Sequence, residues 1–262
     1  MDFTVQHKAI YAATGGRPFD PAQDSVVFVH GAGMDHTVWA LQTRYFAHHG
    51  RSVVALDLPG HGRSAGPALE SIAAMADWLD AFLHAAGIGT TALVGHSMGA
   101  LIALETATRF PGRVRALALL GAAPRMPVHP DLLAAAQAND PLAYDLIMDW
   151  GHGRAGHVGG NRAPGLWLMG GSERLLERGA DGVLHGDLAA CNAYDGGADA
   201  AARVACPALL VLGSEDRMTP AKAGRKLALA ISGARVTEIA GCGHMMMLEK
   251  PDETLDALRT IV

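Results

Sequence analysis

The sequence lacks long apolar runs and clusters of basic residues. No apolar run approaches the ~20 residues that a helix needs to cross a bilayer, so no membrane span is expected. Lysine and arginine are scattered and the formal net charge is −5 at pH 7, which argues against nucleic acid as a partner. Half of the residues are hydrophobic, so 262 residues are enough to bury the core of one large domain.

Cysteine is also scarce. An odd number of cysteines without metal-ligand spacing excludes a disulfide framework and a cysteine-based metal site; the three are Cys191, Cys206 and Cys242. Free thiols are typical of a reducing cytosol, and residues 1–8 lack the charged-then-apolar order of a secretory signal. We therefore expect a cytoplasmic protein with neither a metal nor an organic cofactor.

What the sequence does contain is an alternation of strand and helix patterns. Continuous apolar runs predict strands buried on both faces, and amphipathic segments between them predict helices. The strands are expected at residues 25–29, 52–56, 92–94, 114–120 and 208–212, with less apolar ones at 5–12 and 235–239, and the helices at 38–47, 70–86, 98–110, 221–231 and 252–261. This order predicts an α/β fold with a mostly parallel central sheet and helices on both faces.

The alternation stops after the sixth strand. From there the pattern is helical, at residues 131–138, 141–150, 172–178 and 184–192, with no buried strand. We interpret residues 124–202, called the insertion below, as a helical lid (cap) on a core formed by residues 1–123 and 203–262. A glycine-rich stretch within it, residues 151–160, is expected to be mobile, because glycines make inexpensive hinges.

The most informative motif is Gly-His-Ser-Met-Gly at residues 95–99. It lies between an apolar strand and the start of a helix, which is the context of a nucleophile elbow. A sharp turn there would lift the Ser97 hydroxyl clear of the sheet, where a base on another loop can take its proton. The pentapeptide alone is modest support, so its partners decide the interpretation.

Two candidate partners also follow predicted strands. Asp216 comes after residues 208–212, and His244 after residues 235–239. The carboxyl ends of parallel strands lie at one edge of a sheet, so these side chains are expected to meet Ser97 there. In this interpretation Ser97 attacks a carbonyl carbon, His244 transfers the proton, and Asp216 orients the imidazole. Glu215 is a rival for the acid role.

Five motifs occur in the order found in one family: His-Gly-Ala-Gly at 30–33, Asp-Leu-Pro-Gly-His-Gly-Arg-Ser at 57–64, the elbow at 95–99, Gly-Ser-Glu-Asp at 213–216 and Gly-His at 243–244. With them the chain resembles the α/β-hydrolase fold family, in particular its short, lid-bearing serine hydrolases. The resemblance implies the acid role for Asp216 and an oxyanion hole made by the backbone N–H groups of Ala32 and Met98, with Gly33 as a neighbouring candidate.

The pocket and the remaining histidines are less specific. If the insertion covers Ser97, some apolar residues in or beside it should line a pocket, and we expect contributions from Gly33, Met126, Met148, Trp150, Trp167 and Met245. His30, His61 and His96 lie in motif turns and are expected to bond the backbone. A metal site from His152, His157 and Asp149 is disfavoured because their spacing is irregular.

Together these features predict a serine hydrolase that cleaves a carboxylic ester or related acyl bond in a small-molecule substrate. The same three residues would also serve a C–C bond, lactone or amide hydrolase, an acyltransferase or a cofactor-free perhydrolase. A binding module or receptor of the same fold is the non-enzyme alternative. The sequence does not indicate an oligomeric state.

Overall fold

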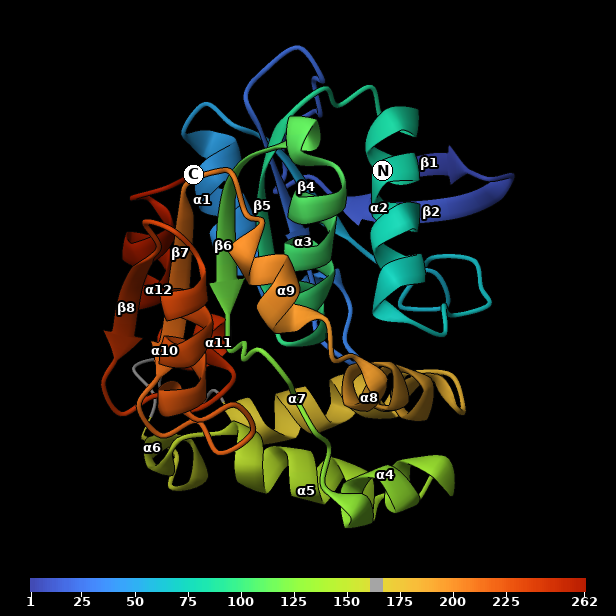
Figure 1. Ribbon diagram of the computed structural model, residues 1–262. Coiled ribbons are helices and arrows are strands. Elements are labelled where there is room, and N and C mark those ends of the chain that lie inside the picture. Colours follow the sequence, from blue (N-terminus) through green and yellow to red (C-terminus); the bar gives the residue numbers. More distant parts are fainter. Residues whose placement is uncertain (161–166) are drawn as a thin grey trace.

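A computed structural model describes residues 1–160 and 167–262. Eight strands form one sheet in the order β1-β2-β4-β3-β5-β6-β7-β8 (Figure 1). Strands β4, β3, β5, β6, β7 and β8 are parallel, and β1 and β2 are antiparallel at one edge. The strands are β1 (Asp2–Val5), β2 (Lys8–Ala13), β3 (Ser25–Val29), β4 (Ser52–Leu56), β5 (Thr91–His96), β6 (Val114–Leu120), β7 (Ala208–Gly213) and β8 (Arg235–Ile239). The predicted α/β class is confirmed.

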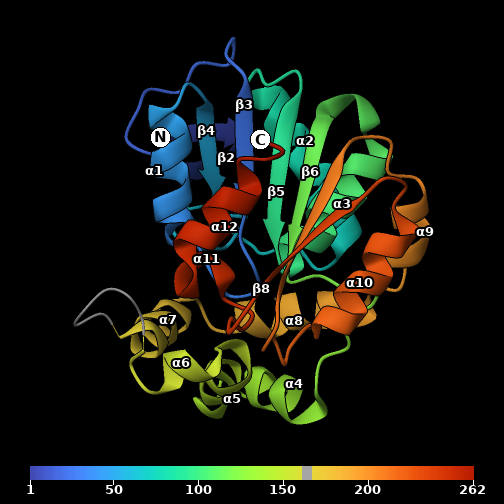
Figure 2. The same ribbon diagram turned by 90° about the vertical axis from the view of Figure 1, so that its left-hand side faces the viewer.

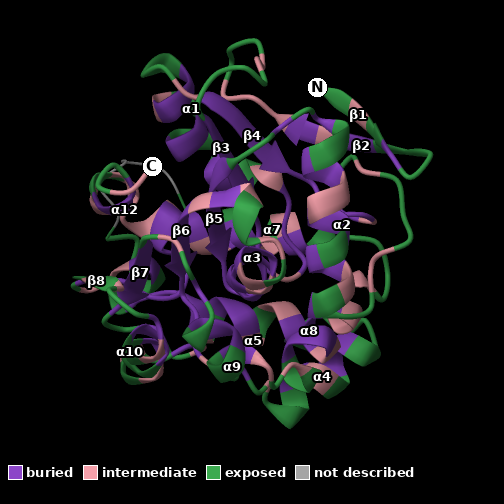
Figure 3. Ribbon diagram, turned by 45° about the horizontal axis from the view of Figure 1, so that its top comes forward, coloured by how far each residue is buried: buried purple, intermediate pink, exposed green. Residues whose placement is uncertain are grey.

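The central strands are buried on both faces. Every residue of β3, β4, β5 and β7 is buried, as expected of strands covered by helices on both sides (Figure 3). In β3, for example, Val27 lies between Val54 of β4 and Leu93 of β5. The edge strand β8 is mostly exposed, which explains its weaker apolar pattern.

The predicted strand at residues 5–12 is confirmed for residues 8–12, which belong to β2, but its first part is wrong because a hairpin turn separates β2 from β1. The chain reverses at Gln6 and His7, whose φ angles are 47° and 64°. Two-residue hairpin turns with both φ angles positive favour Asn, Asp and Gly. Gln6 and His7 carry no such signal, so the turn could not be seen in the sequence.

Helices cover both faces of the sheet. One face carries α2 (Ile72–Ala85), α3 (Met98–Arg109) and α10 (Ala221–Ala230), and the other carries α1 (Ala40–His48), α11 (Met246–Glu249) and α12 (Pro251–Leu258), with 3-10 turns at His36–Trp39 and Pro111–Arg113. Helix α2 begins where the Ser71 hydroxyl accepts a hydrogen bond from the Ala74 N–H, and its buried face includes Leu79 and Phe82.

The insertion lies across the carboxyl ends of the strands (Figures 1 and 2). It contains α4 (Pro130–Gln137), α5 (Leu142–Gly151), α6 (Arg154–His157), α7 (Leu168–Glu177) and α8 (Val183–Ala193). Helices α4, α5, α7 and α8 share an apolar cluster of their own. Helix α9 (Gly197–Ala202) instead packs against α3 and α10, and Ala200 and Ala201 belong to the main core. The helices over the sheet edge therefore end with α8.

Within residues 1–160 and 167–262, no helix combines the length and the apolar character needed to cross a membrane. All three cysteines are free, and Cys191 and Cys242 are buried. Burial raises the pKa of the Cys242 thiol far above its usual value, so this thiol stays protonated.

Candidate active site

Ser97 sits in a strained turn between β5 and α3. Its φ and ψ angles are 53° and −118°, a conformation that costs a side-chain-bearing residue about 1–3 kcal/mol. The glycines on both sides leave no room for a side chain. A Cβ on Gly95 would lie 2.1 Å from the Gly99 oxygen, and a Cβ on Gly99 would lie 2.3 Å from the Val29 oxygen. The elbow therefore depends on glycine at both positions.

Asp216 and His244 meet through a direct hydrogen bond. His244 Nδ1 lies 2.8 Å from Asp216 Oδ2, which also accepts the Thr219 hydroxyl at 2.7 Å. Asp216 Oδ1 accepts the N–H groups of Met218 and Thr219. Burial alone would raise the pKa of Asp216, but His244 and these donors outweigh it and lower the pKa. Glu215, the rival acid, accepts the Arg154 N–H instead.

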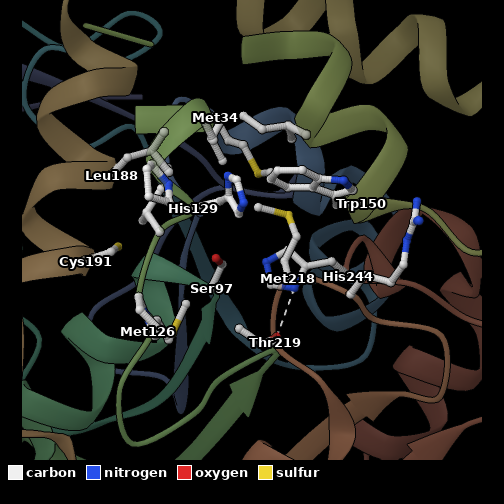
Figure 4. Close-up of a pocket in the computed structure, with 17 residues that line it drawn as sticks. Met34, Ser97, Met126, His129, Trp150, Leu188, Cys191, Met218, Thr219 and His244 are labelled. Carbon is white, nitrogen blue, oxygen red and sulfur yellow. Dashed lines mark hydrogen bonds between the residues drawn. The ribbon is translucent and has the colours of Figure 1, made fainter. Parts of the chain in front are cut away.

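The other ring nitrogen of His244 is left free to act as a base. Asp216 is an acceptor only, so Nδ1 carries the proton and Nε2 carries the lone pair. His244 Nε2 is buried and has no hydrogen-bond partner within the described parts of the chain. Figure 4 shows the Ser97 hydroxyl and His244 facing the same cavity. A Cβ on Gly121 would lie 2.9 Å from the imidazole, so a glycine there makes room for the ring.

His96 and His30 bond the backbone, as the sequence indicates. His96 Nε2 lies 2.9 Å from the His244 carbonyl oxygen and donates to it, which joins the elbow to the His244 loop. Burial lowers the pKa of His96 to about 3 and that of His30 to about 4, so both rings are neutral. His61 also bonds a backbone carbonyl, that of Pro59, but its second nitrogen contacts the carboxylate of Asp187.

The first part of the predicted mobile stretch is in fact bound to the His244 loop. The Gly151 carbonyl accepts the N–H groups of His244 (2.8 Å) and Met245 (3.2 Å). Glu249 Oε2 accepts the Gly153 N–H at 2.7 Å, and the same carboxylate accepts the N–H groups of Gly243 and Met245. Burial raises the pKa of Glu249 although these donors act against it. Backbone groups that glycine leaves accessible thus serve as anchors here, not as a hinge.

The candidate oxyanion donors come from two elements. Met98 is the first residue of α3, where N–H groups have no acceptor within the helix and the dipole favours negative charge. Ala32 lines the cavity that Ser97 and His244 face. Gly33, the neighbouring candidate, donates its N–H to Asp187 Oδ2 at 2.8 Å and is therefore already engaged.

The cavity has a volume of about 560 Å³. Its wall is mostly apolar and combines core and insertion residues: Ala32, Met34, Ser97, Met126, Pro127, Val128, His129, Pro130, Leu132, Ile147, Trp150, Leu188, Cys191, Arg217, Met218, Thr219 and His244. Two predicted pocket residues, Met126 and Trp150, belong to this wall (Figure 4).

The other four predicted pocket residues lie elsewhere. Met148 points into the apolar cluster of the insertion, and Met245 packs in the core under the face that carries α1, α11 and α12. Gly33 and Trp167 border other, separate hollows, and Trp167 is 65% exposed. Helical spacing shows which residues share a face, but it does not show which face points to Ser97.

Comparison with known proteins places the chain in a family. The model of the Alpha/beta hydrolase family matches residues 26–257. The chain belongs to this family. It is 33% identical to a putative carbamate hydrolase of Klebsiella pneumoniae, with 91% of each chain covered. It is 30% identical to the pimeloyl-[acyl-carrier protein] methyl ester esterase of Aromatoleum aromaticum, with 90% of this chain and 97% of that one covered.

A solved structure supports the fold of this α/β hydrolase. The enol-lactonase from Burkholderia xenovorans superimposes with a TM-score of 0.88 at 22% identity, covering 99% of this chain and 98% of that one. At this identity the likeness concerns the fold alone. The assignment as an enzyme of the hydrolase class rests on the family match and the curated relatives.

Several cavity residues of this hydrolase were not predicted. Arg217, Met218 and Thr219 directly follow Asp216, so their place in the sequence could have indicated them. His129 could not be found this way. It caps the N-terminus of α4, where its ring accepts the Asp131 N–H. The ring also packs edge-on against that of Trp150, with 5.3 Å between the ring centroids.

One group of possible metal ligands lies outside the cavity. Within the described ranges, Asp35, His36 and Asp57 bring ligand atoms within 4.8 Å of one another. These atoms already have hydrogen-bond partners: Asp57 accepts the His36 and Arg63 N–H groups, and Asp35 accepts that of Thr37. The group is thus explained by loop structure. His152, the other disfavoured candidate, bonds Met148 and Ser172.

Proposed function

We propose that this α/β hydrolase is a serine hydrolase that cleaves a carboxylic ester or related acyl bond through an acyl-enzyme. The observation that carries the proposal is the bond between Asp216 and His244 Nδ1, which leaves the buried Nε2 without a partner among the described residues, in a cavity that also holds Ser97. A serine becomes a strong nucleophile when such a nitrogen takes its proton.

In the acylation half, Ser97 Oγ forms a bond to the substrate carbonyl carbon while its proton passes to His244 Nε2. The carbonyl oxygen becomes an oxyanion that the N–H groups of Ala32 and Met98 stabilise. The intermediate then collapses, the bond to the leaving group breaks, and the leaving group takes the proton from His244. Asp216 stabilises the imidazolium while it carries the positive charge.

Deacylation repeats these steps with water. A water molecule attacks the acyl carbon and gives a proton to His244 Nε2, and the second intermediate expels Ser97 Oγ, which takes that proton back. The carboxylic acid product then leaves. No step requires a metal ion or an organic cofactor.

The cavity wall suggests the kind of acyl group. Met34, Met126, Leu132 and Leu188 offer apolar contact, so an acyl chain of short to medium length is the favoured substrate. The small side chain of Ala32 keeps space beside the candidate oxyanion site. We further propose that the insertion works as a lid, because α4, α5 and α8 supply much of this wall.

The central prediction concerns Ser97→Ala. This variant should lower kcat for p-nitrophenyl butyrate by roughly 10³-fold or more, because the nucleophile is gone while the cavity is intact. Initial rates of p-nitrophenol release measure it. Ser71→Ala is the matched control: Ser71 caps α2 and is not among the residues that line the cavity, so its loss should leave the rate unchanged. Wild-type turnover by Ser97→Ala would refute the proposal.

A fluorophosphonate probe separates an enzyme from a binding module of the same fold. Rapid labelling of the wild type and of Ser71→Ala, but not of Ser97→Ala, is expected for a serine hydrolase. A folded wild-type protein that takes up no probe would instead support a binding role. A series of acetate, butyrate and octanoate esters, extended to carbamates and lactones, would then define the acyl bond.

A further inference from the structure

A buried carboxylate of the insertion reaches the loop that carries Ala32. Asp187, in α8, is completely buried. Its Oδ2 accepts the Gly33 N–H at 2.8 Å and lies 2.8 Å from His61 Nε2. The loop with Gly33 follows β3 and the loop with His61 follows β4, so one side chain joins two core loops to the insertion. Burying a charge is costly unless it is paired and hydrogen-bonded. Oδ2 of Asp187 meets both conditions, whereas its Oδ1 is buried without a hydrogen-bond partner among the described residues.

The partner of Asp187 is the His61 ring. His61 Nδ1 lies 3.0 Å from the Pro59 carbonyl oxygen, and Nε2 faces the Asp187 carboxylate. With acceptors on both sides, both ring nitrogens donate when the ring is protonated. Burial by itself lowers the pKa of His61, but the charge and hydrogen bond of Asp187 outweigh it and raise the pKa. The geometry and the raised pKa both favour a buried ion pair between the insertion and the core.

The two peptide planes around Ala32 are each bound by a different side chain, His30 and Asp187. The Gly31 carbonyl and the Ala32 N–H belong to one planar unit, and the neutral His30 ring donates from Nδ1 to that carbonyl at 2.8 Å. His30 Nε2 accepts the Leu58 N–H, which fixes this tautomer. The next plane contains the Gly33 N–H, bound by Asp187. The core orients the first plane, and the insertion orients the second.

We propose that Asp187 is a positioning residue for the oxyanion hole: by binding the Gly33 N–H, and itself fixed by His61, it fixes the peptide plane that follows Ala32 and so holds the loop in which the Ala32 N–H points toward the carbonyl that Ser97 attacks. This inference rests on the proposed function, because it needs an oxyanion beside Ala32. The insertion then completes the catalytic geometry as well as covering the cavity.

The test compares Asp187→Ala with Asp187→Asn in the full-length protein. Removing an oxyanion donor outright lowers kcat by about 10²- to 10³-fold, so misdirecting one should lower kcat/KM by about 10- to 100-fold in Asp187→Ala. Asp187→Asn should stay within about threefold of the wild type, because its amide oxygen, in the place of Oδ2, can accept both the Gly33 N–H and the His61 Nε2–H. Kinetics with p-nitrophenyl butyrate measure both.

An inhibitor pair distinguishes positioning from general loss of structure. A trifluoromethyl ketone adds to the serine and forms an oxyanion. The methyl ketone of the same chain length binds in the cavity but forms far less of the oxyanion. Asp187→Ala should lower the affinity for the trifluoromethyl ketone by the same factor as kcat/KM. The affinity for the methyl ketone should stay within about twofold of the wild-type value. Equal weakening of both inhibitors, or wild-type values for both, would overturn the proposal.

A double variant covers the case in which Asp187→Ala does not fold. Asp187→Leu with His61→Phe replaces the ion pair by apolar side chains, which often preserves stability, yet it removes the acceptor for Gly33. The double variant should show the same selective loss of kcat/KM and of affinity for the trifluoromethyl ketone.

Ser97→Ala, assayed in parallel, separates the two hypotheses. If Ser97→Ala is inactive and the Asp187 variants resemble the wild type, only the inference about Asp187 fails. If Ser97→Ala is active, the proposed function itself is refuted.

Discussion

Two attachments of the insertion to the core of this hydrolase differ in chemistry. Near α6, backbone groups of Gly151 and Gly153 hold the His244 loop, with Glu249 as the acceptor that Gly153 and Gly243 share. At α8, Asp187 bonds the Gly33 N–H and pairs with the His61 ring. The first attachment positions the candidate base and the second the candidate oxyanion donor. Each half of the proposed chemistry thus depends on the insertion through a different kind of contact.

The largest effect is expected from breaking the first attachment. Glu249→Ala removes the acceptor for the N–H groups of Gly153 and Gly243 and one of the two acceptors of the Met245 N–H, which still bonds the Gly151 carbonyl. Each buried donor left without a partner costs about 1–3 kcal/mol. The His244 loop should shift, and kcat for p-nitrophenyl butyrate should fall by about 100-fold. Glu249→Gln keeps one acceptor oxygen, so its kcat should fall by only about tenfold. Equal, wild-type rates in both would show that His244 is positioned without Glu249.

The second attachment should have a smaller effect, which makes the free energy of unfolding depend on pH. Because folding raises the pKa of His61, the ion pair contributes fully below the unfolded value near 6.5 and is lost as the pH rises through the folded value. The nearby His30 is neutral, with a pKa of about 4, and the pKa of Asp57 is lowered, so neither titrates in this range. Asp187 is the remaining charged group that faces the ring.

Urea unfolding from pH 6 to pH 9 measures this contribution as the difference in unfolding free energy between the wild type and His61→Gln. The difference should shrink toward higher pH. Asp187→Asn, which also removes the ion pair, should change the pH profile in the same way. A difference that is constant over this range would mean that the His61–Asp187 pair is not ionic.

The smallest effect concerns the cavity wall. Trp150 lines the cavity and packs against His129, so Trp150→Ala should raise KM for p-nitrophenyl butyrate by about 3- to 10-fold with little change in kcat. Trp167, of the same residue type and also in the insertion, lies outside the cavity and is mostly exposed. Trp167→Ala should leave KM within twofold. An effect of equal size from both would place the acyl chain elsewhere.

The contrast between core and insertion also marks what could be predicted from the sequence. The positions of Ser97, Asp216 and His244 could be predicted at strand ends because each follows an apolar run and lies next to turn-forming residues. A parallel sheet then brings such ends to one edge. Most helices were found to within a few residues, since apolar spacing defines them well, but α6, α9 and α11 are short and lacked that signal.

The helical character of the insertion was predicted, but the contacts of its side chains were not. Ile147 and Met148 are neighbours in α5, yet only Ile147 lines the cavity, a difference set by how α5 rotates against α4 and α7. Asp187 was missed for a related reason. A single carboxylate in a helix normally faces solvent, and its partners at Gly33 and His61 are more than 120 residues away in sequence.

The mixed origin of the cavity wall has a practical consequence for engineering. Helices α4 and α5 supply part of the cavity wall but none of Ser97, Asp216 and His244, so a segment from a related hydrolase could be grafted in their place to change the accepted acyl group without altering these three residues. Such a graft would succeed only if it preserved the Gly151 carbonyl and left α8 in register with Gly33. Those two contacts define the minimal interface that any exchanged segment must reproduce.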